Sequence, residues 1–205
     1  MKYPLLNDLG VHRWVDREPS YSDWLAWVLE RLGTVAVFRI LGLELPFNPE
    51  DAGNCYVRRE SQLDERYLDL LICFDNRPDY AIGVEVKKYD SQYAKQDDYL
   101  RSLRDCYVNP PCILIAIPEK IDESQLCGFT LRPWRNVALA LREEIAEYAK
   151  KNGEENRIVT AMMLGFVAAV EQNILGFGPA APRRVSRHEP TLVPPDLVTY
   201  LGGDE

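Results

Sequence analysis

Two acidic residues and a lysine lie inside segments that otherwise have the composition of β-strands. Residues 66–74 (RYLDLLICF) contain Asp69, and residues 80–89 (YAIGVEVKKY) contain Glu85 and Lys87. Both segments are rich in Tyr, Val, Ile and Leu, and the polar sequence DNRPD separates them, so we expect an antiparallel hairpin. Charges inside a strand need a partner or a function, because an unpaired buried charge is costly.

A hairpin turn centred on Arg77 brings the two acidic residues opposite each other. That register pairs positions whose numbers add to 154, which places Asp69 opposite Glu85. Opposed residues on one sheet face have Cβ atoms about 4.5–5.5 Å apart, and like charges at this separation repel. Lys87 follows Glu85 by two residues and therefore projects from the same face. A register slip of one residue would place the two acids on opposite faces.

Two interpretations of this group of charges stay open. In the first, Lys87 neutralises the two acids in a structural ion triad, which is a weak source of stability. In the second, the acids bind a hard cation such as Mg²⁺, which takes one or two carboxylates and keeps several waters for a phosphate substrate. Asp69 and Glu85 with Lys87 alone stay net negative, so the charge balance favours the Mg²⁺ site.

The elements around the hairpin indicate one α/β domain over residues 1–177, followed by a tail over residues 178–205. Ser20 can cap a helix that ends at Gly33. Further elements are expected as strands over 55–60, 111–119 and the start of GFTLRPWRNV, and as helices over 91–107, 134–151 and 154–177. Five of the 14 prolines fall in the tail, which predicts an extended arm that could bind a protein partner.

Composition limits the classes of partner. The chain has 205 residues and a formal net charge of −8, so nucleic-acid binding would need a local basic patch. The five cysteines form no CxxC pair, which favours reduced buried thiols over a zinc site or disulfides. The first residues lack the apolar run of an export signal, and no segment has the length of a membrane span. We therefore expect a cytoplasmic protein without membrane contact.

The segment RYLDLLICFDNRPDYAIGVEVKKYDSQYAKQDDYLRSL resembles the core of the PD-(D/E)XK nuclease superfamily, in which an Asp on one strand and a Glu-x-Lys on the next form a divalent-metal nuclease site. REPSYSDWLAWVLE is similar to the first helix of uncharacterised and defence-associated bacterial members, QDDYL to the following Gln and Tyr helix motif, and FTLRPWRNVALAL to the late strand, Trp and helix. The resemblance covers residues 18–175. It implies an αβββαβ restriction-endonuclease-like core with a mixed central sheet and added C-terminal helices.

The resemblance also implies roles for individual residues. Lys87 would orient the attacking water, and Gln96 would hydrogen-bond water or a phosphate. Glu18 is favoured over Glu30 as the acid of the first helix. The catalytic residues would be Asp69, Glu85, Lys87 and Gln96, and the metal ligands would be Asp69, Glu85, the main-chain carbonyl of Val86, and Glu18.

The implied activity is a Mg²⁺-dependent nuclease, with Mn²⁺ as a substitute, that hydrolyses phosphodiester bonds of DNA. Lys and Arg contacts to phosphate supply affinity without sequence information, and the candidate substrate contacts are Arg58, Arg59, Lys88 and Tyr99. Homodimerisation is expected, because double-strand cutting by one small domain commonly needs two sites. The alternative is a catalytically weak nuclease-like module that binds nucleic acid or a protein partner.

Overall fold

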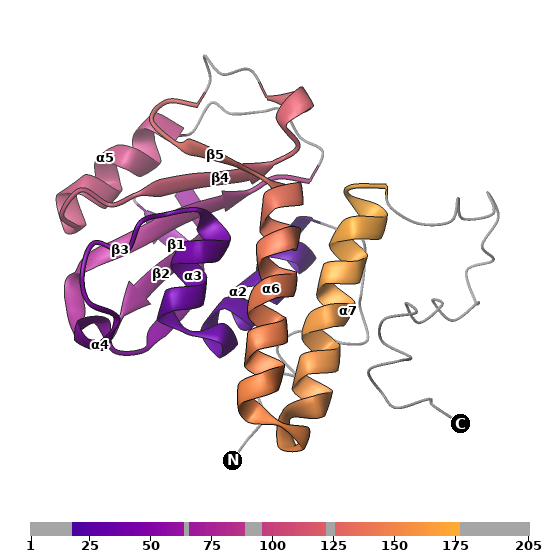
Figure 1. Cartoon of the computed structure of the whole chain (residues 1–205). Coiled ribbons are helices and arrows are strands. Elements are labelled where there is room, and N and C mark those ends of the chain that lie inside the picture. Colours follow the sequence, from indigo (N-terminus) through magenta and orange to yellow (C-terminus); the bar gives the residue numbers. More distant parts are fainter. Residues whose placement is uncertain (1–17, 64–65, 89–95, 122–125, 177–205) are drawn as a thin grey trace, which may run out of the picture. The chain divides into compact units, whose positions relative to one another are not determined.

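The computed structural model describes residues 18–63, 66–88, 96–121 and 126–176 (Figure 1). It divides into two compact units, Met1–Val137 and Ala138–Glu205, and each unit is considered by itself. The predicted arm over residues 178–205 lies outside the described residues, so the division into a 177-residue domain and an arm stays a prediction. None of the helices in the described part is long and apolar enough to cross a membrane.

A mixed five-stranded sheet forms the centre of the first unit, with the strand order β1-β2-β3-β4-β5. β1 (Cys55–Leu63), β2 (Arg66–Phe74) and β3 (Arg77–Val86) form an antiparallel meander. β4 (Cys112–Ala116) and β5 (Thr130–Pro133) continue the sheet in parallel from β3. All five residues of β4 are buried, as expected for the continuous apolar run of a parallel strand. The predicted mixed α/β class is confirmed.

The β2–β3 hairpin has the predicted register but a different turn. Leu70 pairs with Val84 and Ile72 with Ile82, so the pairs add to 154 as predicted. The turn itself is the two-residue segment 75–76 rather than one centred on Arg77, and the register shifts beside it, between Cys73 and Phe74. Phe74 pairs with Arg77, whereas the preceding residue Cys73 pairs with Ala81, so residues 78–80 of β3 have no partner on β2. Pro78 is one of these residues. Because proline cannot donate a ladder hydrogen bond, it favours an irregularity at this position.

Helices cover both faces of the sheet in the first unit. α5 (Gln96–Cys106) packs on the face that carries Leu71 and Cys73. Gly83 allows this close packing, because a Cβ there would lie 2.7 Å from Cδ1 of Leu103 in α5. α2 (Glu18–Leu32) lies on the opposite face, where the Cys55 thiol points to the carbonyl of Leu29. The predicted helices over 20–33 and 91–107 are therefore present, although residues 91–95 lie outside the described part.

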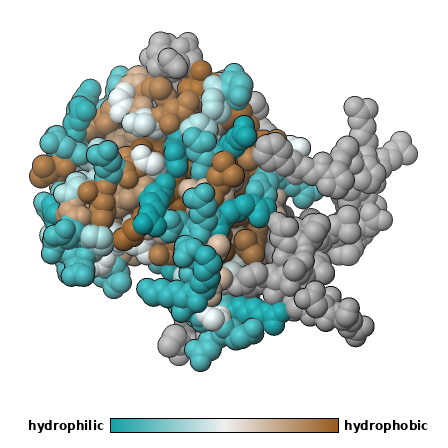
Figure 2. Space-filling view, viewed as in Figure 1, coloured by the Kyte–Doolittle hydropathy of each residue, from teal (hydrophilic) through white to brown (hydrophobic). Residues whose placement is uncertain are grey.

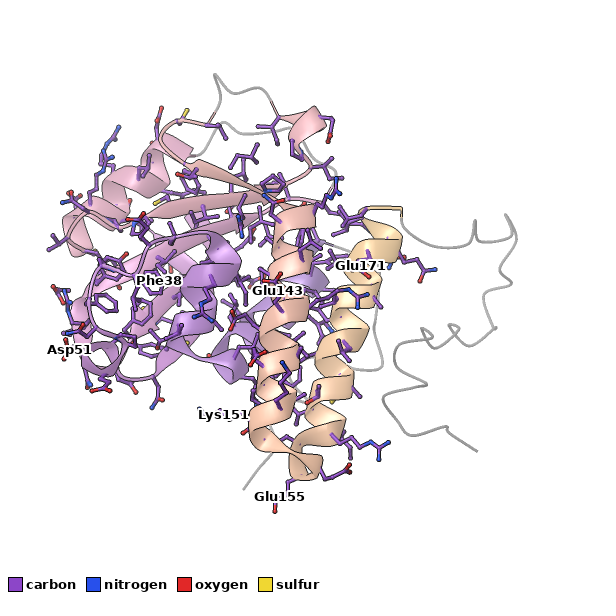
Figure 3. The ribbon with its side chains drawn as sticks, viewed as in Figure 1. Phe38, Asp51, Glu143, Lys151, Glu155 and Glu171 are labelled. Atoms are coloured by element: carbon purple, nitrogen blue, oxygen red, sulfur yellow. The ribbon has the colours of Figure 1, made fainter. Side chains whose placement is uncertain are left out.

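Two short helices that the sequence pattern does not indicate follow α2. They are α3 (Thr34–Leu41) and α4 (Pro49–Ala52). Phe38 of α3, labelled in Figure 3, stacks on Tyr80 of β3 at 6.3 Å between ring centroids. Arg132 of β5 donates to the carbonyls of Ile40 and Arg39 at 2.9 and 3.2 Å, which satisfies acceptors at the C-terminal end of α3.

All five cysteines are free, and Cys55, Cys73 and Cys112 are buried. Burial raises the pKa of Cys55 to about 11 and that of Cys112 to about 12. Thiols with raised pKa values are poor nucleophiles and poor metal ligands. These two buried cysteines therefore serve the packing of the sheet.

The second unit contains a helix pair. α6 (Trp134–Asn152) begins in the first unit, and α7 (Arg157–Asn173) follows it after a 3₁₀ turn over Glu154–Asn156. The helices run side by side in Figure 1, and the Arg142 guanidinium donates two hydrogen bonds to Glu171 at 2.7 and 2.6 Å. Figure 2 shows hydrophilic and apolar side chains interspersed over the viewed face of the protein.

Candidate active site

The two acidic residues of the hairpin lie where the ladder between β2 and β3 ends. Leu70 and Val84 form the last pair at this end, and Asp69 and Glu85 are the next positions on each strand. The Asp69 side chain takes over the hydrogen bonding here, because the Val86 amide donates to its Oδ2 at 2.7 Å. The two carboxyl groups therefore lie side by side at one end of the hairpin.

The neighbouring strand is also irregular at this level. The β1–β2 ladder pairs Arg59 with Leu70 and Ser61 with Leu68 but has no Glu60–Asp69 pair. Glu60 has a φ of 45°, in the left-handed region that residues other than glycine rarely adopt. Such a conformation costs about 1–3 kcal/mol and is concentrated at functional sites. The backbone distortion at Glu60 therefore indicates a functional site beside Asp69, and this indication does not depend on the charge of Asp69.

Lys87 lies between two carboxylates. Its Nζ is 2.9 Å from Oε1 of Glu85 and 3.0 Å from Oε1 of Glu18, the first residue of α2. The second oxygen of Glu18 accepts the Lys88 amide at 2.9 Å. Glu30, the other candidate acid of the first helix, accepts the Val57 amide of β1 at 2.7 Å instead. Of the two acids, Glu18 is the one that lies at the site. Its two oxygens accept hydrogen bonds from the Lys87 ammonium and from the Lys88 backbone amide.

A buried tryptophan holds the backbone of this segment, and a tyrosine beside it contacts the next side chain. Trp134 is fully buried, and its indole Nε1 donates to the Lys87 carbonyl at 2.9 Å. Its ring packs edge to face on Tyr21 at 6.2 Å, and the Lys88 ammonium lies 5.1 Å from the same Tyr21 ring. Trp134 thus holds the Lys87 backbone, and the Tyr21 ring contacts the Lys88 ammonium.

One oxygen of Glu85 has no partner. Oε1 of Glu85 contacts Lys87, whereas Oε2 is buried and accepts no hydrogen bond from the described residues. A buried carboxylate oxygen without a partner calls for an ion or a water at that position. In the described part of the chain, no three His, Cys, Asp or Glu residues form a cluster able to hold a metal ion. The acids here that could hold a cation are Asp69 and Glu85, with water as the remaining ligand.

Burial and neighbouring charges shift the pKa values of the two acids. Burial first, and then the charge of Glu85, raise the pKa of Asp69 to about 7. Burial likewise raises the pKa of Glu85, with Lys87 opposing the shift. Burial disfavours the Lys87 ammonium, but the charges of Glu85 and Glu18 outweigh this effect and raise the pKa of Lys87. Lys87 therefore stays positively charged. The raised pKa of Asp69 means that a proton or a further cation is favoured between Asp69 and Glu85.

The candidate substrate contacts have different surroundings. Lys88 is only 3% exposed, and Arg59 forms an ion pair with Asp23 at 2.8 Å. Tyr99 is buried and donates to the Tyr67 carbonyl at 2.7 Å, so it anchors the strand that carries Asp69 and does not face a substrate. Arg58 is exposed, 5.6 Å from the ring of Tyr56. Gln96 begins α5, and its side chain lies outside the described part.

No protein-family model matches the chain, and neither the curated proteins nor the solved structures contain a match.

Proposed function

We propose that the protein is a divalent-metal-dependent nuclease of the PD-(D/E)XK type, which hydrolyses phosphodiester bonds of DNA. The observation that carries the proposal is the Glu85 carboxylate, which has Lys87 on one oxygen and no partner on its buried second oxygen. Asp69, whose pKa is raised by burial and then by the neighbouring Glu85 charge, supplies the second carboxylate. A purely structural ion pair does not need this second acid.

The order of the elements supports the proposal. A helix (α2) precedes the meander β1-β2-β3, then α5 leads to the parallel strand β4. Apart from the short helices α3 and α4 between α2 and β1, this succession agrees with the αβββαβ order that the resemblance implies. Asp69 lies on β2, and the Glu-x-Lys of Glu85 and Lys87 lies at the end of β3. These are the two positions that the resemblance assigns to the site.

Asp69, Glu85 and the carbonyl of Val86 would hold the ion, which neutralises phosphate charge and makes a bound water more acidic. Lys87 stays protonated because two carboxylates flank it, so it serves as a hydrogen-bond donor and not as a general base. Its ammonium would orient the attacking water in line with the leaving oxygen and stabilise the charge that develops on the phosphate oxygens. Trp134 holds the Lys87 backbone in place for this task.

A second function is favoured by one contact. Because Glu18 also binds Lys87, the three side chains of Glu18, Lys87 and Glu85 resemble a structural ion triad. In that case the protein would be a catalytically weak nuclease-like module that binds nucleic acid or a protein partner. The two functions differ in their response to divalent cations and in the effect of removing Glu85.

The test is a cleavage assay on supercoiled plasmid, linear duplex, single-stranded DNA and RNA, each with EDTA, Mg²⁺ or Mn²⁺. We expect cleavage with either cation and none with EDTA. Glu85→Gln should abolish cleavage and Lys87→Ala should slow it about 10²–10³-fold, whereas the exposed Glu50→Gln of α4 should retain it as a matched control. The proposal fails if no substrate is cut, or if Glu85→Gln cuts as fast as Glu50→Gln.

A further inference from the structure

Within the described residues, the backbone of Asp69 is paired in the ladder of neither neighbouring strand. The ladder between β2 and β3 ends at Leu70 and Val84, next to the acid. On the other side, the β1–β2 ladder has pairs at Leu70 and at Leu68 but none at Asp69. Ladder hydrogen bonds normally fix the backbone of a strand residue. Other contacts must therefore set the position of this acid.

α5 supplies such a contact two residues before Asp69. The hydroxyl of Tyr99 in α5 donates to the Tyr67 carbonyl of β2 at 2.7 Å. Tyr99 is only 3% exposed, and a buried tyrosine hydroxyl usually has a specific hydrogen-bond partner. The start of β2, which no longer pairs with β3, is therefore tied to α5 instead.

The helix that carries Tyr99 is itself closely packed on the sheet. Leu103 of α5 and Leu68 of β2 belong to the same buried cluster as Tyr99. Gly83 of β3 makes room for both, because a Cβ there would lie 2.7 Å from Cδ1 of Leu103 and 3.3 Å from Cδ2 of Leu68. Side chains in a close-packed core have little freedom to move. The Tyr99 hydroxyl is therefore held at a defined point beside β2.

The contact of Tyr99 with the acid is indirect. The side chain is buried and its hydroxyl is bound to the Tyr67 carbonyl, so it does not touch a substrate. Residues 67 and 69 are separated by about 7 Å along a strand, so any effect of Tyr99 on Asp69 passes through the backbone. Groups that orient a metal ligand from outside the coordination shell typically change metal affinity about 10- to 100-fold.

We propose that Tyr99 is a positioning residue of the ion site, whose hydroxyl fixes the start of β2 and thereby holds the Asp69 carboxylate where it shares a cation with Glu85. This inference rests on the proposed nuclease function. It adds a residue that touches neither the ion nor the DNA and that controls ion affinity through the backbone of β2.

The test is a Mg²⁺ titration of the full-length wild type and of Tyr99→Phe, in which the rise of the melting temperature with ion concentration gives the Kd for Mg²⁺. Tyr99→Phe removes the hydroxyl and keeps the buried ring. Thr34→Val is the matched control, because the buried Thr34 hydroxyl also donates to a carbonyl, that of Gly53, at 2.8 Å. Gly53 precedes β1 at the turn end of the hairpin, opposite to the end that carries Asp69.

We expect Tyr99→Phe to raise the Kd for Mg²⁺ about 10-fold, the lower end of the usual range, because the hydroxyl acts through the backbone. Thr34→Val should leave this Kd unchanged, although both variants should melt at a lower temperature than the wild type in EDTA. At saturating Mg²⁺, the KM of Tyr99→Phe for DNA should equal that of the wild type, because the phenol does not contact DNA.

An unchanged Kd for Mg²⁺ in Tyr99→Phe, in a wild type that binds the ion, would overturn this inference and leave the nuclease proposal intact. An equal rise of the Kd in Thr34→Val would also overturn it, because the effect would then come from lower stability alone. A raised KM for DNA with an unchanged Kd would instead make Tyr99 a substrate contact. A wild type without any Mg²⁺ response would refute the ion site and both proposals with it.

Discussion

Asp69→Asn should stabilise the metal-free protein at neutral and alkaline pH. The amide keeps an acceptor oxygen for the Val86 amide, which donates to Asp69 at 2.7 Å, but it removes the charge that burial and Glu85 disfavour. The pKa of Asp69 is raised from 3.8 to about 7 in the folded protein. Each pKa unit between the folded and unfolded states corresponds to about 1.4 kcal/mol.

The sign of the pH dependence follows from proton binding. Because the folded pKa of Asp69 lies above the unfolded value, the folded state binds more protons between about pH 4 and pH 7. The contribution of Asp69 to stability is therefore lost as the pH rises through this range and stays constant above it. The full difference corresponds to about 4 kcal/mol, and access of water to the site reduces it, so we expect about 2–4 kcal/mol at pH 8.

The assay is urea unfolding of the wild type and of Asp69→Asn in EDTA at several pH values. The variant should be more stable by about 2–4 kcal/mol at pH 8, and the difference should vanish near pH 4. Added Mg²⁺ should stabilise the wild type and leave the variant nearly unchanged, because the ion replaces the missing counter-charge. Parallel pH profiles of the two proteins in EDTA would refute the reasoning.

Three further variants test individual contacts of the site. Lys87→Ala should slow cleavage about 10²–10³-fold while keeping the Mg²⁺-induced rise of the melting temperature, since Lys87 is no ion ligand. Glu18→Gln should lower kcat more than it changes KM and should keep the Mg²⁺ response, because both Glu18 oxygens bind lysine groups. Trp134→Phe should cost about 1–3 kcal/mol in urea unfolding, because it leaves the partly buried Lys87 carbonyl without its donor.

The mass of the protein in solution is also informative. The sequence led us to expect a homodimer, because cutting both strands of a duplex by one small domain commonly needs two sites. Sedimentation velocity at high concentration should therefore give a dimer, and a monomer would count against this expectation.

The sheet and the pairing of the acids were predictable because both depend on local patterns. β-Branched and aromatic residues mark β2 and β3, and period-two alternation fixes which residues face each other. The register of the pairs next to the acids, from Leu70 with Val84 to Ile72 with Ile82, follows from the apolar runs and not from the turn, so it was correct although the turn was placed wrongly. Pro78 was the available signal for the irregularity beside the turn.

The contacts that complete the site were not predictable, because they join distant parts of the chain. Glu18 and Lys88 are 70 residues apart, and Trp134 and Lys87 are 47 apart, so only the packing of α2 and of Trp134 against the sheet brings them together. α3 was missed for a related reason. Its sequence TVAVFRIL is rich in β-branched residues, and its helix is stabilised by tertiary contacts of Phe38 and Arg132.

The most direct test of the metal site is the melting temperature of the wild type and of Glu85→Ala, each with EDTA and with Mg²⁺. If the acids bind the ion, Mg²⁺ should stabilise the wild type by up to about 2.7 kcal/mol at a hundredfold excess over Kd, and Glu85→Ala should lose this response. The variant should cost little stability in EDTA, since it relieves repulsion with Asp69. A loss of about 3–5 kcal/mol in EDTA, with no Mg²⁺ response in the wild type, would instead show a structural ion triad and contradict the nuclease site.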